Sequence, residues 1–133
     1  MTGKRLLVFG GSGFIGRHLV GRLAASGAQI RVAVRHPDAA TFLKPMGDVG
    51  QITPIQANVR CADSVWTALD GADAVVNLVG ILSGSRRQRF DAVHRDGAAH
   101  IAQSAIQTGV KRLGHLSSLG ASSDSTSHYA RSK

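Results

Sequence analysis

Four glycines crowd into seven positions between an apolar run and a segment of helical periodicity: Gly10, Gly11, Gly13 and Gly16. Glycine is costly in regular structure, so this repetition indicates that something approaches the main chain closely. At the start of a helix that follows a strand, unpaired N–H groups and the helix dipole favour a phosphate. Gly10 would permit the tight turn, Gly13 would clear space for a pyrophosphate, and Gly16 would let the helix pack close to the sheet. The glycines therefore predict a dinucleotide-binding loop, with a ligand-free glycine turn as the alternative.

The end of the second expected strand bears on which dinucleotide binds. An acidic residue at this place usually accepts hydrogen bonds from the ribose 2′-hydroxyl of NAD. Here Val34 is followed by Arg35, and Asp38 comes only after His36 and Pro37. A guanidinium suits a 2′-phosphate and can stack on adenine. The sequence therefore favours NADP(H) over NAD(H), unless Arg35 is an ordinary exposed arginine.

A tyrosine and a lysine stand four residues apart at the end of the sequence, Tyr129 and Lys133. Residues at this spacing share one face of a helix. A neighbouring ammonium lowers the pKa of a tyrosine from its ordinary value of ~10, which makes the phenol a usable acid or base near neutral pH. The alternative is a chance pair after the serine-rich segment 120–127, which is expected to be a loop.

Strand-like and helix-like segments alternate along the chain and would position these groups. Strands are expected at Arg5–Phe9, Ile30–Val34, Ile52–Gln56, Ala74–Val79 and Arg112–Leu116. Helices are expected from Phe14 to Gly27, at Asp38–Leu43, at Ala62–Leu69 and at Phe90–Thr108. Such alternation is typical of βαβ units with right-handed crossovers, a parallel sheet and helices on both faces. The glycines then lie between a strand and a helix, which is the context that a phosphate loop requires.

Composition limits the class of protein and its partners. The 133 residues, 43% of them hydrophobic, are enough for one domain with a buried core. The net charge of +8 favours anionic partners such as nucleotides, acidic lipid surfaces or nucleic acid, unless it serves only solubility. The few aromatic residues form no stacking platform, so nucleic acid is not expected.

The cysteine content and the hydropathy pattern indicate the cellular compartment in which the protein is expected. Cys61 is the one cysteine, which excludes an internal disulfide, and no Cys/His spacing suggests a metal site. No apolar run approaches the ~20 residues that a membrane span needs. The glycine loop interrupts the first apolar run, so a signal peptide is not expected and the predicted location is cytoplasmic.

Four motifs occur in the order typical of the short-chain dehydrogenase/reductase superfamily: GGSGFIG, AVVNLVG, HLSSLGA and YARSK. Together they resemble the extended and atypical branch, the NAD-dependent epimerase/dehydratase-like proteins, over essentially the whole chain. Within that branch, the segment VHRDGAAHIAQSAIQTGVKRLGHLSSLGA is similar to nucleotide-binding accessory subunits of respiratory complex I and their bacterial relatives.

The resemblance implies an α/β fold, a Rossmann-type doubly wound parallel sheet with strand order 3-2-1-4-5, truncated after the fifth strand. Residues 1–133 would then be the N-terminal part of an NAD(P)-binding domain, and the substrate-binding part would be absent. The substrate is left unidentified.

The resemblance also implies roles for individual positions. The catalytic set would be Ser118, with Ser117 as the alternative serine, Tyr129 and Lys133. Asn58 stands where the family usually has aspartate near the adenine, and its amide could still serve that base. The implied cofactor-binding set is Gly10, Gly11, Ser12, Gly13, Phe14, Ile15, Gly16, Arg35, Asn58, Val59, Leu78, Val79, Gly80, Tyr129 and Lys133.

Two classes of function remain open. One is an NADP-dependent oxidoreductase, epimerase or dehydratase, in which Ser118 polarises the substrate oxygen and the nicotinamide exchanges a hydride. The other is a non-catalytic accessory subunit whose fold NADPH stabilises. Its partner would be a respiratory complex or an acidic membrane surface, at the inner face of an energy-transducing membrane. A redox sensor that reads the NADP(H) ratio would use the same site.

Overall fold

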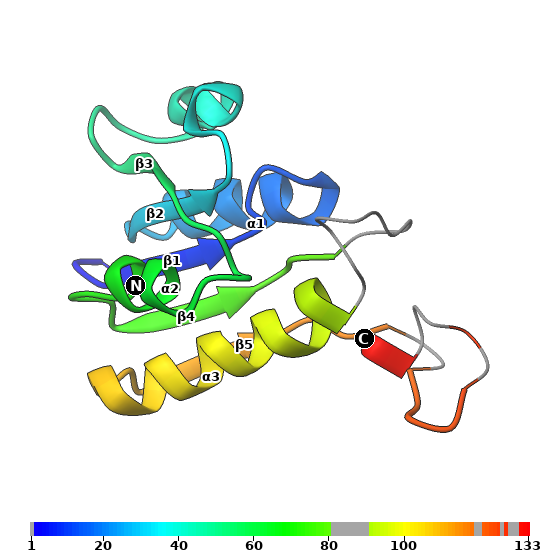
Figure 1. Cartoon of the computed structure of the whole chain (residues 1–133). Coiled ribbons are helices and arrows are strands. Elements are labelled where there is room, and N and C mark those ends of the chain that lie inside the picture. The colour runs from blue at the N-terminus through cyan, green and yellow to red at the C-terminus, as the bar shows by residue number, and fades with distance from the viewer. Residues whose placement is uncertain (1, 81–90, 119–120, 126, 128–130) are drawn as a thin grey trace.

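The computed structural model describes residues 2–80, 91–118, 121–125, 127 and 131–133. One five-stranded sheet organises the molecule, and its strands are all parallel (Figure 1). The elements in chain order are β1 (Arg5–Phe9), α1 (Phe14–Ala25), β2 (Gln29–Val34), η1 (Pro37–Met46), β3 (Ile52–Gln56), α2 (Ala62–Ala68), β4 (Ala74–Asn77), η2 (Asp91–Asp96), α3 (Gly97–Thr108) and β5 (Arg112–His115).

The strand order is β3-β2-β1-β4-β5, which confirms the expected doubly wound topology. The central strand pairs on both sides: Val8 lies opposite Val32 of β2 and opposite Val76 of β4. The chain adds β2 and β3 on one side of β1, and then β4 and β5 on the other. In open parallel sheets, ligands bind beyond the carboxyl ends of the strands, where the order of addition reverses.

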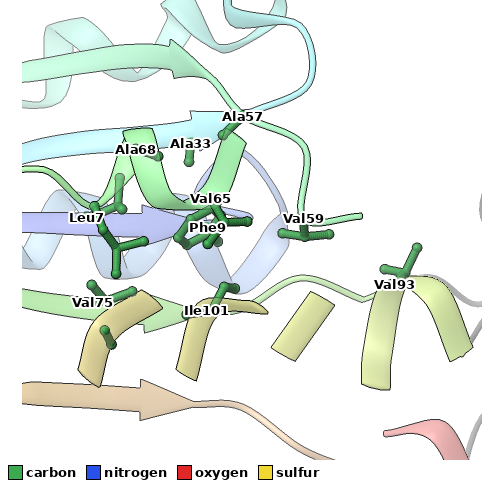
Figure 2. Close-up of a cluster of buried hydrophobic side chains, with 12 residues drawn as sticks. Leu7, Phe9, Ala33, Ala57, Val59, Val65, Ala68, Val75, Val93 and Ile101 are labelled. Carbon is green, nitrogen blue, oxygen red and sulfur yellow. The ribbon is translucent and has the colours of Figure 1, made fainter. Parts of the chain in front are cut away.

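Two apolar layers pack on the two faces of the sheet, because successive side chains of a strand point to opposite faces. Leu6 and Val8 pack in one layer with residues of α1 and η1, whereas Leu7 and Phe9 pack in the other with residues of α2 and α3. Figure 2 shows the second layer, in which Ile101 of α3 lies close to the sheet. The glycine loop therefore follows a strand that is buried on both faces.

The structure divides the long helix that the sequence predicts over residues 90–108. A π-helical turn, η2, precedes α3, and both Val93 and His94 of this turn are buried. Helix α3 begins at Gly97, where an added Cβ would lie 3.0 Å from the Cβ of Val59. Such wide turns occur frequently at functional sites.

The fourth strand is shorter than predicted. It ends at Asn77 because the Asn77 side-chain oxygen accepts the N–H of Val79 at 3.1 Å, which directs the chain out of the sheet. No helix in the described part of the chain has the length and apolar character needed to cross a bilayer.

Candidate dinucleotide-binding site

A cleft of about 360 Å³ opens at the carboxyl ends of β1, β2, β3 and β4. It is lined by Phe9, Gly10, Ser12, Gly13, Ala33, Val34, Arg35, His36, Ala39, Ala57, Asn58, Val59, Leu78, Val79, Gly80 and Val93. Its apolar floor continues the buried layer of Figure 2, which includes Phe9, Val59 and Val93. No lining residue that the structure describes is acidic, so the cleft is suited to an anion.

Three glycines of the loop are explained by the protein's own packing. Gly10 has φ +79°, and a Cβ there would lie 2.9 Å from the carbonyl carbon of Leu78. A Cβ on Gly11 would lie 2.7 Å from a methyl group of Val32. A Cβ on Gly16 would lie 2.6 Å from the Cα of Gly11, so this glycine lets α1 pack against the loop itself. These contacts exclude larger residues whether or not a ligand binds.

Gly13 has no such explanation within the protein. Its φ of −75° and ψ of −175° are open to other residues, and the nearest atom to an added Cβ is the Gly10 oxygen at 3.5 Å. Gly13 caps the N-terminus of α1 and lines the cleft. The first N–H groups of a helix have no intrahelical acceptor. The bare main chain of Gly13 thus adjoins donors that face a cavity.

Arg17, which the sequence analysis missed, arranges the carbonyl groups of the loop. Its Nε donates to the Gly13 oxygen at 3.2 Å, and its Nη2 donates to the Ser12 oxygen at 3.1 Å. Its guanidinium also stacks over the ring of Phe42, 4.9 Å from the ring centre. The Gly13 oxygen also accepts the Arg17 main-chain N–H at 2.9 Å, so Arg17 holds this part of the loop through both its main chain and its side chain. The signal in the sequence was an arginine four residues after the helix cap.

The other side of the cleft carries two basic residues and an amide. Arg35 and His36 follow β2 directly, and Asn58 follows β3. The side-chain oxygen of Asn58 accepts the Arg60 N–H at 3.0 Å, and its main-chain N–H donates to the Ser64 hydroxyl at 2.9 Å. Because that oxygen is already occupied, Asn58 would offer a base the N–H groups of its amide.

Lys133 reaches the same cleft from the end of the chain. Its ammonium donates to the Val79 oxygen at 2.9 Å, and the Ser117 hydroxyl donates to the main-chain oxygen of Lys133 at 3.2 Å. Burial lowers the pKa of Lys133 from its ordinary value. The Ser118 hydroxyl oxygen is buried and has no hydrogen-bond partner among the described residues.

The structure brings together part of the predicted set. The predicted residues that line the cleft are Gly10, Ser12, Gly13, Arg35, Asn58, Val59, Leu78, Val79 and Gly80, and Lys133 contacts this group through the Val79 oxygen. Tyr129 lies outside the described residues.

Four residues of the predicted cofactor-binding set do not line the cleft, and neither does Ser118 or its alternative Ser117. Gly11 and Gly16 are buried against the loop and the core. The side chains of Phe14 and Ile15 are exposed, and neither residue belongs to the lining of the cleft. The sequence analysis also missed two lining residues, His36 after β2 and Val93 of the π-helical turn η2.

Metal binding has no support in the described residues. They contain no group of three or more histidine, cysteine, aspartate or glutamate side chains that could hold an ion.

The amino-acid sequence of the chain is similar to those of known proteins. The chain is 37% identical to subunit 9 of the mitochondrial NADH dehydrogenase (ubiquinone) 1 alpha subcomplex of Dictyostelium discoideum, over 99% of this chain and 37% of that protein. It is 32% identical to the ceramide reductase of Caulobacter vibrioides, over 95% of this chain and 38% of that protein. The chain thus spans less than two fifths of the length of either relative.

Solved structures show the same fold. A short-chain type dehydrogenase/reductase from Mycobacterium marinum superposes with a TM-score of 0.83 at 28% identity, over 99% of this chain and 64% of that one. A mutant uronate dehydrogenase from Agrobacterium tumefaciens, complexed with NAD, gives a TM-score of 0.72 at 28% identity, over 89% of this chain and 42% of that one.

These comparisons confirm the resemblance to short-chain dehydrogenases/reductases and to the complex I subunit, and they make the cofactor a nicotinamide dinucleotide. Residues 10–133 match the family model for NAD(P)H-binding proteins. A match over that length, together with the sheet and the glycine loop, shows that the chain belongs to the NAD(P)H-binding family.

Proposed function

We propose that the cleft binds NADP(H) across the carboxyl ends of the strands. The pyrophosphate lies over Gly13, the 2′-phosphate meets Arg35, and the nicotinamide half lies beside Val79 and Gly80. The observation that carries this proposal is the glycine at position 13, because the protein's own packing does not require one there. A ligand that approaches the main chain does require it.

The preference for NADP(H) rests on the charges beside β2. Arg35 and His36 line the cleft, and no acidic residue among the described lining is available for a ribose 2′-hydroxyl. A guanidinium contributes charge-assisted hydrogen bonds to a phosphate, each about 1.5–3 kcal/mol. We therefore expect NADPH to bind at least about tenfold more tightly than NADH.

Calorimetric titration of the wild-type chain and of Arg35→Gln with both cofactors tests this preference. The substitution should weaken NADPH binding about tenfold and leave NADH binding nearly unchanged. Equal affinities in the wild type would contradict the assignment of NADP(H). Failure of both cofactors to bind would contradict the dinucleotide site as a whole.

Two polar groups from the predicted catalytic set support an oxidoreductase. The buried Ser118 hydroxyl is suited to hold a substrate oxygen, and Lys133 already occupies the rim of the cleft. Tyr129 would donate the proton to that oxygen, helped by the ammonium four residues away. The bound nicotinamide supplies or accepts the hydride.

Ser118→Ala separates substrate handling from cofactor binding. Under this proposal it lowers turnover of a carbonyl substrate by about a hundredfold or more while NADPH affinity stays within about twofold. A full-length protein that binds NADPH yet reduces no member of a carbonyl panel would argue against catalysis.

A second candidate function is a non-catalytic NADPH-binding subunit of a respiratory complex. The observation that favours it is the 37% identity with a complex I subunit over nearly the whole chain. In this role the cofactor stabilises the fold, because a ligand that binds only the native state adds to its stability. Co-purification with complex I, retention of NADPH through the isolation and absence of turnover would together select this candidate.

A further inference from the structure

A histidine outside the cleft holds the turn that carries Lys133. The Nδ1 atom of His94 lies 2.8 Å from the Ser132 hydroxyl oxygen, and both residues are buried. Ser132 immediately precedes Lys133, whose ammonium donates to the Val79 oxygen at 2.9 Å. His94 belongs to the π-helical turn η2, which also places Val93 in the wall of the cleft. One turn of chain thus contacts both the cleft and the lysine.

The second ring nitrogen of His94 lies near the lysine ammonium. A Cβ added to Gly80 would lie 2.9 Å from the Lys133 Nζ and 3.7 Å from the His94 Nε2. Both nitrogens are therefore close to the same position beside Gly80. A proton on buried His94 would therefore set a second cation beside the half-buried Lys133, and like charges repel.

Burial and two neighbouring groups among the described residues disfavour the protonation of His94. Burial is the main cause that lowers the pKa of His94, and the charge of Lys133 and the ring of His115 on β5 lower it further. The ionisable neighbours on its own turn, Asp91, Arg95 and Asp96, are exposed. At neutral pH the ring is therefore uncharged, and it gains a proton only as the pH falls below the ordinary histidine value of ~6.5.

We propose that His94 is a positioning residue: as a neutral imidazole it holds Ser132 and so keeps the Lys133 ammonium at the nicotinamide end of the cleft. Protonation of His94 releases that turn and weakens binding of the nicotinamide half, while the adenosine half at Arg35 is unaffected. This inference depends on the proposed binding of NADP(H) in the cleft. It adds a pH-dependent control of that site.

Two variants separate the hydrogen bond from the charge. His94→Asn keeps a polar group at the δ position, within reach of Ser132, and cannot become a cation in this pH range. Ser132→Ala removes the hydrogen bond and leaves the histidine. Thr108→Ala is the matched control. The Thr108 hydroxyl also makes one hydrogen bond, to the main-chain oxygen of Ser104 at 2.7 Å, but it lies at the far end of α3.

Calorimetry from pH 7.5 to 5.0 with two probes tests the inference. NADP⁺ spans both halves of the site, and adenosine 2′,5′-bisphosphate carries only the adenosine half with the same 2′-phosphate. The ratio of wild-type to His94→Asn affinity at each pH cancels the titration of the 2′-phosphate and of every group that the two chains share. Linkage limits the fall of wild-type affinity to about tenfold per pH unit below the pKa of His94.

The expected result is that this ratio falls on acidification for NADP⁺ and stays level for the bisphosphate. At pH 7.5, Ser132→Ala should weaken NADP⁺ severalfold and leave the bisphosphate unchanged, and Thr108→Ala should change neither.

Identical pH profiles for the wild type and His94→Asn would overturn the inference. So would equal losses for both probes, or a loss in Thr108→Ala as large as in Ser132→Ala. Failure of NADP⁺ to bind the wild type at pH 7.5 is a different outcome, because it overturns the proposed function itself.

Discussion

Replacement of Gly13 by alanine separates ligand approach from folding. The new methyl group would meet only the Gly10 oxygen, at an ordinary contact distance of 3.5 Å, and the backbone angles are open to alanine. The fold should therefore tolerate the change. The methyl group would nevertheless lie where a pyrophosphate must approach the start of α1.

The size of both effects can be estimated. Alanine at a compatible position stabilises by about 0.4–1 kcal/mol through the unfolded chain, and alanine is a poorer helix cap than glycine by a similar amount. We expect the free energy of unfolding of Gly13→Ala to stay within about 1 kcal/mol of the wild type, a shift in Tm of roughly 4 °C or less. Loss of even one charge-assisted hydrogen bond to phosphate costs about 1.5–3 kcal/mol, so NADPH should bind ten- to a hundredfold more weakly.

Calorimetry gives the affinity, and thermal unfolding without ligand gives the stability. Gly16→Ala is the contrasting variant, because its Cβ would lie 2.6 Å from the Cα of Gly11 and main-chain atoms would have to move. We expect it to lose about 2–3 kcal/mol or more of stability. A folded Gly13→Ala chain that binds NADPH as tightly as the wild type would refute the reasoning, and so would a Gly13→Ala chain as unstable as Gly16→Ala.

Two further predictions concern stability. Buried Gln51 donates to the Ala24 and Ala28 oxygens at 2.8 Å each, so Gln51→Ala should cost about 2–4 kcal/mol in urea unfolding, and a loss below about 1 kcal/mol would contradict this account. The Arg5 main-chain N–H, at 2.8 Å, holds the pKa of Asp73 below its usual value. The resulting stabilisation is present above about pH 4 and is lost as pH falls through the lowered pKa. The Tm advantage of the wild type over Asp73→Asn should therefore shrink in acid, and a constant difference from pH 6 to 2.5 would show that the carboxylate charge contributes nothing.

Local sequence patterns predicted most of the fold. A continuous apolar run is typical of a strand buried on both faces, and the predicted bounds of β1 agree with the structure at every residue. The predicted bounds of β3 agree as well. β3 contains Pro54, which has no N–H to donate, and this strand lies at the edge of the sheet. The end of β4 was missed because it depends on the side chain of Asn77 accepting a main-chain N–H, which no periodicity reveals.

The candidate site was only partly predictable for the same reason. A motif read along the chain identifies Gly13, since its signal is local. Arg17, Val93 and His94 act through contacts that the strand order and the π-helical turn create, and no spacing in the sequence announces them. The structure also distinguishes glycines that serve packing from Gly13, whereas the motif treats them alike.

The central claim is that a dinucleotide lies across the glycine loop with its adenosine half at Arg35. Titration of the ¹⁵N-labelled chain with NADP⁺, followed by amide NMR shifts, tests it most directly. The account predicts the largest shifts at the amides of residues 12–16 and 35–36, with smaller ones at Val79 and Gly80. Shifts confined to the amino ends of the strands, around Lys4 and Lys111, would contradict it. The absence of any shift at saturating NADP⁺ would also contradict it.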